Sequence, residues 1–133
     1  MKLFAAVAAM VGGALLLVIP RFVFRTCEAI GRGRMHCTDL AHGEYLVGAL
    51  LVLTGVALII LESNKAAIAA AGCTTVLSVA AFFVPAYTRY CANPEMPCHY
   101  GMAPSVRFIA VVLGIVEVTA LAGLVRESKR RDA

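Results

Sequence analysis

The chain has 133 residues, of which 61% are hydrophobic and only 15% are charged, and it contains no Trp. This composition is too apolar for a water-soluble domain of this size and is typical of a small integral membrane protein. Basic residues at membrane boundaries account for the formal net charge of +4, and no basic and aromatic stripe indicates a nucleic-acid partner. We therefore expect a single all-α domain over residues 1–133, with the lipid bilayer as its surroundings.

Four apolar segments have about the length that a membrane-spanning helix needs, which is ~20 residues. In chain order they cover residues 3–19, 45–61, 66–86 and 106–125. The first follows Lys2 as in a signal peptide, but no Ala-x-Ala-like cleavage site closes it, so we expect a retained helix. The sequence thus predicts an integral membrane four-helix bundle of two tandem hairpin repeats, about 1–62 and 66–126, followed by a basic tail at 126–133.

The two long loops carry the same ordered pattern of Pro, Cys and Met-x-Cys, and only the spacers between these residues differ in length. This recurrence indicates an internal duplication. Two parallel hairpin repeats related by an axis along the membrane normal would place both loops on one face of the membrane. The pattern reads Pro20, Cys27, Met35 and Cys37 in the first loop, and Pro85, Cys91, Met96 and Cys98 in the second.

The distribution of Lys and Arg does not decide the orientation, because equal numbers fall on the two sides of the predicted bundle. We expect cytoplasmic termini, since the cluster Lys129–Arg131 follows helix four, where anionic lipid attracts each charge by about 1 kcal/mol. Cysteines paired in short loops also fit an oxidising compartment. The expected location is the cell (inner) membrane, crossed several times, with the Cys-containing loops extracytoplasmic.

The four loop cysteines, Cys27, Cys37, Cys91 and Cys98, are interpreted first as structural disulfides. A bond within each loop would close a short segment and contribute about 2–3 kcal/mol through loop entropy, whereas bonds between the loops would lock the hairpins together. The sequence leaves the connectivity open. Stapled loops predict an accessory or scaffold subunit with no catalytic residue, more readily than an enzyme.

A soft-metal site is the first alternative. In an extended segment residues i and i+2 point the same way, so each Met-x-Cys would present two sulfurs to one face. Thioether and thiolate ligands together favour Cu(I). A cysteine in a disulfide is no longer a thiolate ligand, so the copper and disulfide interpretations exclude each other. The predicted copper ligands are Met35, Cys37, Met96 and Cys98, with His36 or His99 adding an imidazole.

Thiol–disulfide exchange is the second alternative. Four helices, cytoplasmic termini and a cysteine pair in each outer loop resemble in outline the quinone-linked disulfide-generating enzymes of the DsbB type. Those enzymes are expected to carry a C-x-x-C pair, in which closeness lowers the attacking thiol's pKa. The chain contains no such pair. The resemblance therefore implies the outline and leaves the catalytic pair unaccounted for.

The motif copies also resemble an uncharacterised family of small prokaryotic four-helix membrane proteins, known only as a domain of unknown function. The residues that carry this resemblance are Cys27…Met35-His36-Cys37 with Ala41 and Glu44, and the segment 91–98. The resemblance covers nearly the whole chain and implies a subunit that works beside a larger membrane complex such as a transporter. A homo-oligomer is the other expected form of partner. It implies no reaction. Thr38 stands where the family is expected to have a His, and His99 follows the second motif instead.

Glu117 is the intramembrane acid of the chain, near the middle of helix four. An unpaired charge facing lipid there costs at least ~2.5 kcal/mol, so we expect Glu117 to face the bundle. The favoured interpretation is a neutral carboxyl hydrogen-bonded to a hydroxyl, and the functional alternative is a proton or cation step. The candidate hydroxyl partners are Thr54, Thr74, Thr75 and Ser78.

Three further residues or groups receive structural predictions. Glu44 is placed at the mouth of helix two, where a carboxylate near a helix N-terminus is favourable. Cys73, inside helix three, is interpreted as a small buried hydrophobe. Small residues at Ala5, Ala9 and Gly13 are expected to let helix one approach its neighbours closely.

Overall fold

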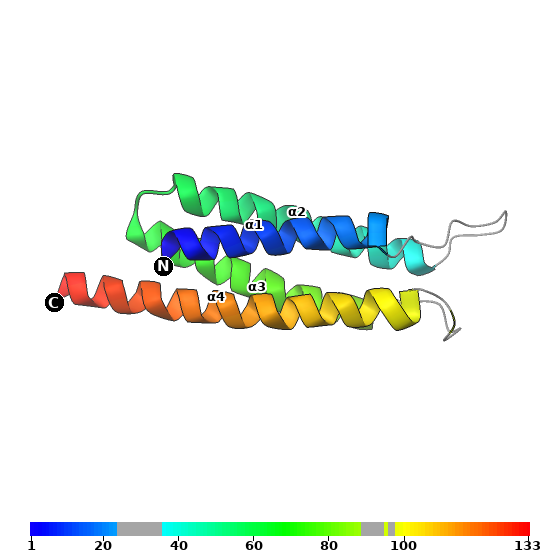
Figure 1. Cartoon of the computed structure of the whole chain (residues 1–133). Coiled ribbons are helices and arrows are strands. Elements are labelled where there is room, and N and C mark those ends of the chain that lie inside the picture. Colours follow the sequence, from blue (N-terminus) through cyan, green and yellow to red (C-terminus); the bar gives the residue numbers. More distant parts are fainter. Residues whose placement is uncertain (24–35, 89–94, 96–97) are drawn as a thin grey trace.

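A computed structural model describes residues 1–23, 36–88, 95 and 98–133 of the chain. These residues are helical apart from short connections and contain no strand, which confirms the predicted all-α four-helix architecture (Figure 1). Two short π-helical segments extend the helices at the end where the long loops begin. The elements are α1 (Lys2–Val18), η1 (Ile19–Val23), α2 (His36–Ile60), α3 (Asn64–Tyr87), η2 (Cys98–Met102) and α4 (Ala103–Asp132).

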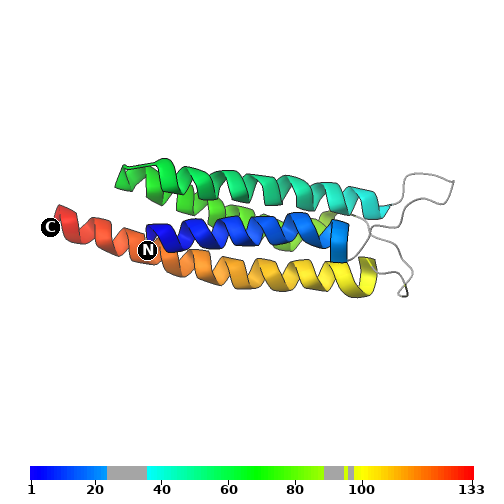
Figure 2. The ribbon, with the colours of Figure 1, turned by 45° about the horizontal axis from the view of Figure 1, so that its top comes forward.

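The four helices run alternately up and down and pack around one core (Figures 1 and 2). Each helix packs against the next along the chain, and α4 also packs against α1, so the bundle closes on itself. Both termini and the turn between α2 and α3 lie at one end, which we call the terminal end. The described residues that flank the two long connections lie at the other end, which we call the loop end: Val23, His36, Thr88 and Cys98.

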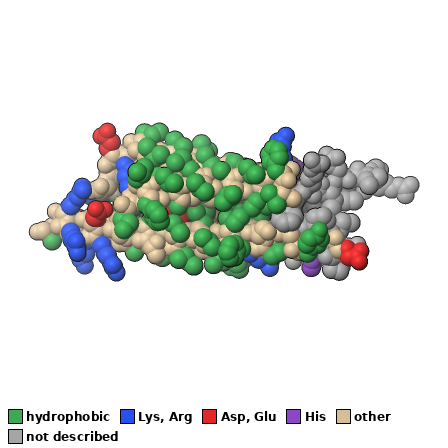
Figure 3. Space-filling view, in the orientation of Figure 1, with side chains coloured by type: hydrophobic (Ala, Val, Ile, Leu, Met, Phe, Trp, Pro, Cys, Tyr) green, Lys and Arg blue, Asp and Glu red, His purple; other side chains and the backbone are tan. Residues whose placement is uncertain are grey.

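All four helices are long and apolar enough to cross a membrane. Large hydrophobic side chains cover the outside of the bundle, whereas Lys and Arg gather towards its ends (Figure 3). Side chains such as Leu3, Leu53 and Phe108 are more than half exposed, which suits contact with lipid rather than water. The chain is therefore a multi-pass membrane protein.

The core consists of two buried apolar clusters along the bundle axis. The cluster nearer the loop end includes Leu16, Leu40, Leu51, Met102 and Val106. The cluster nearer the terminal end is made largely of alanines, with Leu58 and Leu124. Pro20 and Pro85, which the repeat pattern aligns, are both buried in the last turns before the loop end.

Close contact between α1 and α2 depends on two glycines. A Cβ atom added to Gly13 would lie 2.6 Å from the Gly48 carbonyl oxygen, and one added to Gly48 would lie 2.9 Å from the Gly13 carbonyl oxygen. Ala5 and Ala9, on the same helix face as Gly13, are fully buried. These contacts confirm the prediction that small residues bring α1 close to its neighbour. Membrane helices associate through such close packing because no hydrophobic driving force acts between them in lipid.

The segment 126–133, predicted as a tail beyond helix four, is helical as far as Asp132. Glu127 and the basic residues after it have high helix propensity, which lets the helix continue past the apolar span. Lys129–Arg131 occupies the last turn, where cations interact favourably with the carbonyl end of the helix dipole. At the same end of the bundle, the Lys2 ammonium donates a hydrogen bond to the Leu61 carbonyl, one of the acceptors that the end of α2 leaves free.

Cys73 is exposed on the outer face of α3, so the prediction that it is buried is wrong. Ala71 and Thr74 lie on the buried face of α3. Because an α-helix has 3.6 residues per turn, Cys73 falls on a different face from these two residues. The thiol therefore faces the region that lipid occupies.

Candidate functional site

Glu117 lies on the buried stripe of α4 and has an exposed fraction of 0%, as predicted for an acid that faces the bundle. Val106, Ala110 and Leu113 precede it on this stripe, and Ala120 follows. Across the interface, α3 presents Thr74, which is also fully buried. The Thr74 Oγ1 atom lies 2.8 Å from Glu117 Oε2, so this hydrogen bond joins α3 to α4 within the membrane.

The same hydroxyl constrains the protonation of Glu117. Thr74 Oγ1 also lies 2.8 Å from the carbonyl oxygen of Ala71, which is an acceptor only. A hydroxyl has one proton to donate and lone pairs to accept. Both contacts are complete hydrogen bonds only when the Glu117 carboxyl carries a proton and donates it to Thr74. This geometry supports a neutral carboxyl in a place where an unpaired charge is costly.

Of the four hydroxyls predicted as partners of Glu117, only Thr74 makes the contact. The other three contact only carbonyl oxygens of their own helices. The Thr54 hydroxyl contacts the carbonyl oxygens of Leu50 and Leu51. The Thr75 hydroxyl donates to the Ala71 carbonyl, and the Ser78 hydroxyl donates to the Thr74 carbonyl. The remaining carboxyl oxygen of Glu117, Oε1, has no hydrogen-bond partner among the described residues.

Glu44 is a second intramembrane acid, and its predicted place at the mouth of helix two is wrong. Because α2 begins at His36, Glu44 lies more than two turns inside the helix. Its exposed fraction is 0%, and neither carboxyl oxygen has a hydrogen-bond partner within the described part of the chain. It shares a helix stripe with Leu40, Val47 and Leu51, all of which belong to the apolar core.

The two acids occupy different levels of the bundle. Gly43, next to Glu44, faces Val84 of α3, whereas Glu117 faces Thr74 of the same helix. Those two positions on α3 are separated by about 15 Å at a rise of ~1.5 Å per residue. Glu44 therefore lies near the loop end and Glu117 near the middle, so they do not form one carboxylate pair.

The predicted sulfur and imidazole ligands that the structure describes belong to elements that begin at the loop end. Cys27, Met35, Cys91 and Met96 lie outside the described residues. His36 and Cys37 begin α2, and Cys98 begins η2, and for these three only the backbone is described. His99, in η2, is exposed. The extended geometry assumed for the copper site is absent at Cys37 and Cys98, because both residues have helical backbone.

The residues that follow the two Met-x-Cys motifs are anchored in one core. Leu40 lies one turn after Cys37 and Met102 lies one turn after Cys98, and both are fully buried in the cluster nearer the loop end. The helices that follow the two motifs thus start from the same end of a common packed interior. Within the described ranges no group of three or more His, Cys, Asp and Glu residues could hold a metal ion.

These observations define the class of the protein: a small, all-helical, multi-pass membrane protein with two acids buried in its bundle. The chain belongs to the family described as "Domain of unknown function (DUF4418)", which matches residues 9–125. The resemblance inferred from the loop motifs is therefore confirmed at the level of an uncharacterised family. No curated protein and no solved structure matches the chain.

Proposed function

We propose that the protein is a membrane scaffold, an accessory subunit whose bundle presents two disulfide-stapled loops on the extracytoplasmic side. The observation that carries this proposal is the convergence at the loop end. The described residues on both sides of each Cys-containing segment lie at this end. In the elements that follow the two segments, Leu40 and Met102 are buried in one cluster. Short loops held by such a base keep a fixed surface when disulfides restrain them.

The orientation in this proposal is supported by the basic cluster at the opposite end of the bundle. Lys129–Arg131 forms the last turn of α4 at the terminal end, beyond the apolar span. Basic residues just outside a span favour the cytoplasmic side, where the lipid surface is anionic. Cytoplasmic termini put the loop end in the compartment where disulfides form and persist.

The accessory role is supported by how the interior is used. Close packing of α1 on α2 and the Thr74–Glu117 bond between α3 and α4 both join neighbouring helices of the bundle. A bundle built in this way is suited to holding loops and an outer apolar surface against a larger membrane protein. The proposed partner is a larger membrane complex such as a transporter, and a second copy of the chain is the alternative.

Native electrophoresis of the protein from mildly solubilised membranes tests the scaffold. We expect the parent to migrate in a discrete assembly larger than the single chain. The double variant Cys27→Ser, Cys91→Ser should lose this assembly while its helix content is retained, and Cys73→Ser is the matched control because Cys73 lies on the outer face of α3. An assembly that survives the double variant unchanged would contradict a role for the stapled loops.

A soft-metal centre is the second candidate, and the same convergence of the loop end favours it because four sulfur donors would come from one side of the bundle. The proposed ligands are Met35, Cys37, Met96 and Cys98. Copper binding measured in reduced protein should then be lost in the Met35→Leu, Met96→Leu double variant. Equal copper binding by parent and double variant would rule this candidate out. Reversible cycling of the cysteines with a quinone would instead support the DsbB-like alternative.

A further inference from the structure

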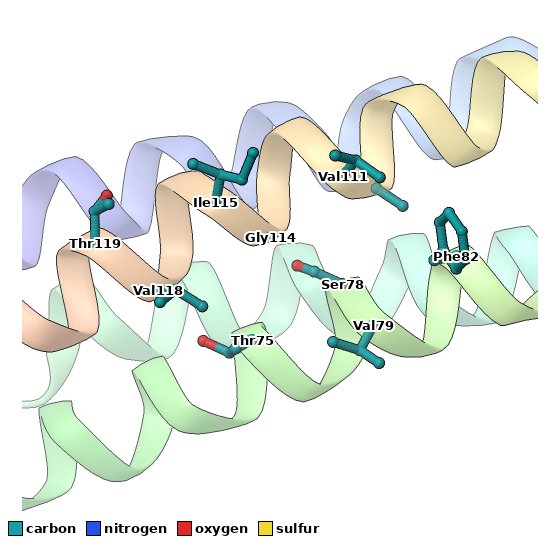
Figure 4. Close-up of a pocket in the computed structure, with 10 residues that line it drawn as sticks. Thr75, Ser78, Val79, Phe82, Val111, Gly114, Ile115, Val118 and Thr119 are labelled. Carbon is teal, nitrogen blue, oxygen red and sulfur yellow. The ribbon is translucent and has the colours of Figure 1, made fainter.

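A groove of about 460 Å³ runs along the outer side of the bundle between α3 and α4 (Figure 4). Its volume lies within the range of about 300–1,000 Å³ that is usual for ligand sites. Side chains from the two helices face each other across it, with the small residues Ala110 and Gly114 on the α4 side. The walls Val79, Ile115 and Val118 are about half exposed or more, so the groove opens outwards, towards the region that lipid occupies.

The polar residues in this groove do not offer free donors to a ligand. The Thr75 hydroxyl donates to the Ala71 carbonyl at 3.0 Å, and the Ser78 hydroxyl donates to the Thr74 carbonyl at 2.9 Å. Thr119 likewise donates to the Val116 carbonyl at 2.8 Å. Because the hydroxyl protons are used within the helices, the groove presents an essentially hydrocarbon surface. Such a surface suits an acyl chain, which brings no polar group that would need a partner.

Arg107 adds a positive charge at the end of the groove nearer the loop end. It lies one helical turn before Val111, on the same face of α4, and its guanidinium carbon is 5.9 Å from the centre of the Phe82 ring, which lines the groove. The Arg107 Nε atom is buried and has no hydrogen-bond partner among the residues that the structure describes. A guanidinium presents donors in a planar fork that matches phosphate oxygens.

Arg107 lies close to the depth of a lipid headgroup. Phe82 lies about 10 Å from the middle of α3 at ~1.5 Å per residue, and half of a ~30 Å hydrocarbon core is ~15 Å. Helical side chains lean towards the N-terminus, and the N-terminus of α4 is at the loop end. Arg107 therefore lies about 5 Å inside the hydrocarbon boundary, a depth from which long basic side chains near helix ends extend to the headgroups.

We propose that the groove between α3 and α4 is a binding site for one phospholipid, whose acyl chain lies along the groove and whose phosphate is bound by Arg107. Charge decides between the possible occupants. A neutral apolar helix of a partner would fill the groove and leave the guanidinium without an acceptor, whereas a phospholipid supplies both a hydrocarbon chain and an anion. This site goes beyond the proposed scaffold function and does not depend on the state of the loop cysteines.

Native mass spectrometry of the delipidated protein, titrated with phosphatidylglycerol in detergent, tests this site. We expect one lipid to bind more tightly than the rest, and Arg107→Gln to weaken that binding about tenfold, the scale of a lost charge-assisted hydrogen bond. Arg107→Lys should retain part of the affinity, because it keeps the charge without the fork. Arg21→Gln is the matched control, since Arg21 is exposed at the same end of the bundle in η1.

Two further measurements separate the contribution of the lipid phosphate from that of the acyl chain. Diacylglycerol with the same acyl chains should bind about tenfold more weakly than phosphatidylglycerol, and inorganic phosphate should not displace the lipid. Gly114→Leu places a side chain in the groove and should reduce lipid binding without changing helix content. Equal binding by the parent and Arg107→Gln, equal binding of the two lipids, or photocrosslinking from position 115 to a protein instead of lipid would overturn the proposal.

Discussion

Replacing Thr74 by Val should destabilise the bundle more than replacing Glu117 by Gln. Among the described residues, Thr74 carries the only hydroxyl that contacts Glu117, so the Thr74→Val change leaves both carboxyl oxygens without a described partner. A buried polar group without a hydrogen bond costs about 1–3 kcal/mol. In Glu117→Gln the amide can donate to Thr74 Oγ1 as the protonated carboxyl does, so we expect a change below about 0.5 kcal/mol.

A double-mutant cycle measures this contact directly. The four proteins are the parent, Thr74→Val, Glu117→Leu and the double variant, unfolded in detergent micelles and followed by circular dichroism. Interhelical hydrogen bonds in membrane proteins contribute ~0.6–1.7 kcal/mol, so we expect a coupling energy in that range. Thr75→Val is the matched control, because the Thr75 hydroxyl bonds the same Ala71 carbonyl but not Glu117.

Two results would refute the reasoning. A coupling energy of zero would mean that Thr74 and Glu117 do not stabilise each other. A Glu117→Gln variant as unstable as Thr74→Val would mean that the carboxyl is ionised and is stabilised by an interaction that a neutral amide cannot replace.

Three other outcomes are expected. Glu44→Leu should raise the free energy of unfolding by about 1 kcal/mol or more, because it removes a buried carboxyl whose oxygens have no described partner; a lower unfolding midpoint would contradict this. Gly48→Ala should lower it by about 1–3 kcal/mol, since its Cβ would lie 2.9 Å from the Gly13 carbonyl oxygen, whereas the same change at Gly72, where a Cβ meets nothing within 4 Å, should have no such cost. A fluorescent protein fused after Ala133 should fluoresce in cells if the termini are cytoplasmic, and an alkaline phosphatase fused there should be inactive.

The membrane architecture could be predicted from the sequence because apolar length and composition directly determine which segments can cross a bilayer. The start of α2 could not be predicted in this way. Residues 36–44 include His42 and Glu44, which lower the local hydropathy and place the apparent span at Tyr45. The helix starts earlier because tertiary packing of Leu40 and Ala41 stabilises its first turns, an effect that a hydropathy pattern does not contain.

The inward direction of Glu117 could be predicted from the small residues on its stripe, but the choice of Thr74 could not. Thr74 and Thr75 are adjacent on α3, and only the relative rotation of two packed helices decides which of them meets the acid. Glu44 could have been recognised as buried, because its spacing to Leu40, Val47 and Leu51 follows one helix stripe. That stripe becomes visible once the helix is extended back to His36.

In the proposed scaffold the four loop cysteines are oxidised and hold a fixed surface. This proposal is tested most directly by the intact mass of the purified protein after alkylation, with and without reductant, together with its metal content. Of the five cysteines, we expect only Cys73 to be alkylated without reductant, all of them to be alkylated after reduction, and no copper to be bound. Loop cysteines that react without reductant in protein that carries stoichiometric copper would contradict the stapled scaffold.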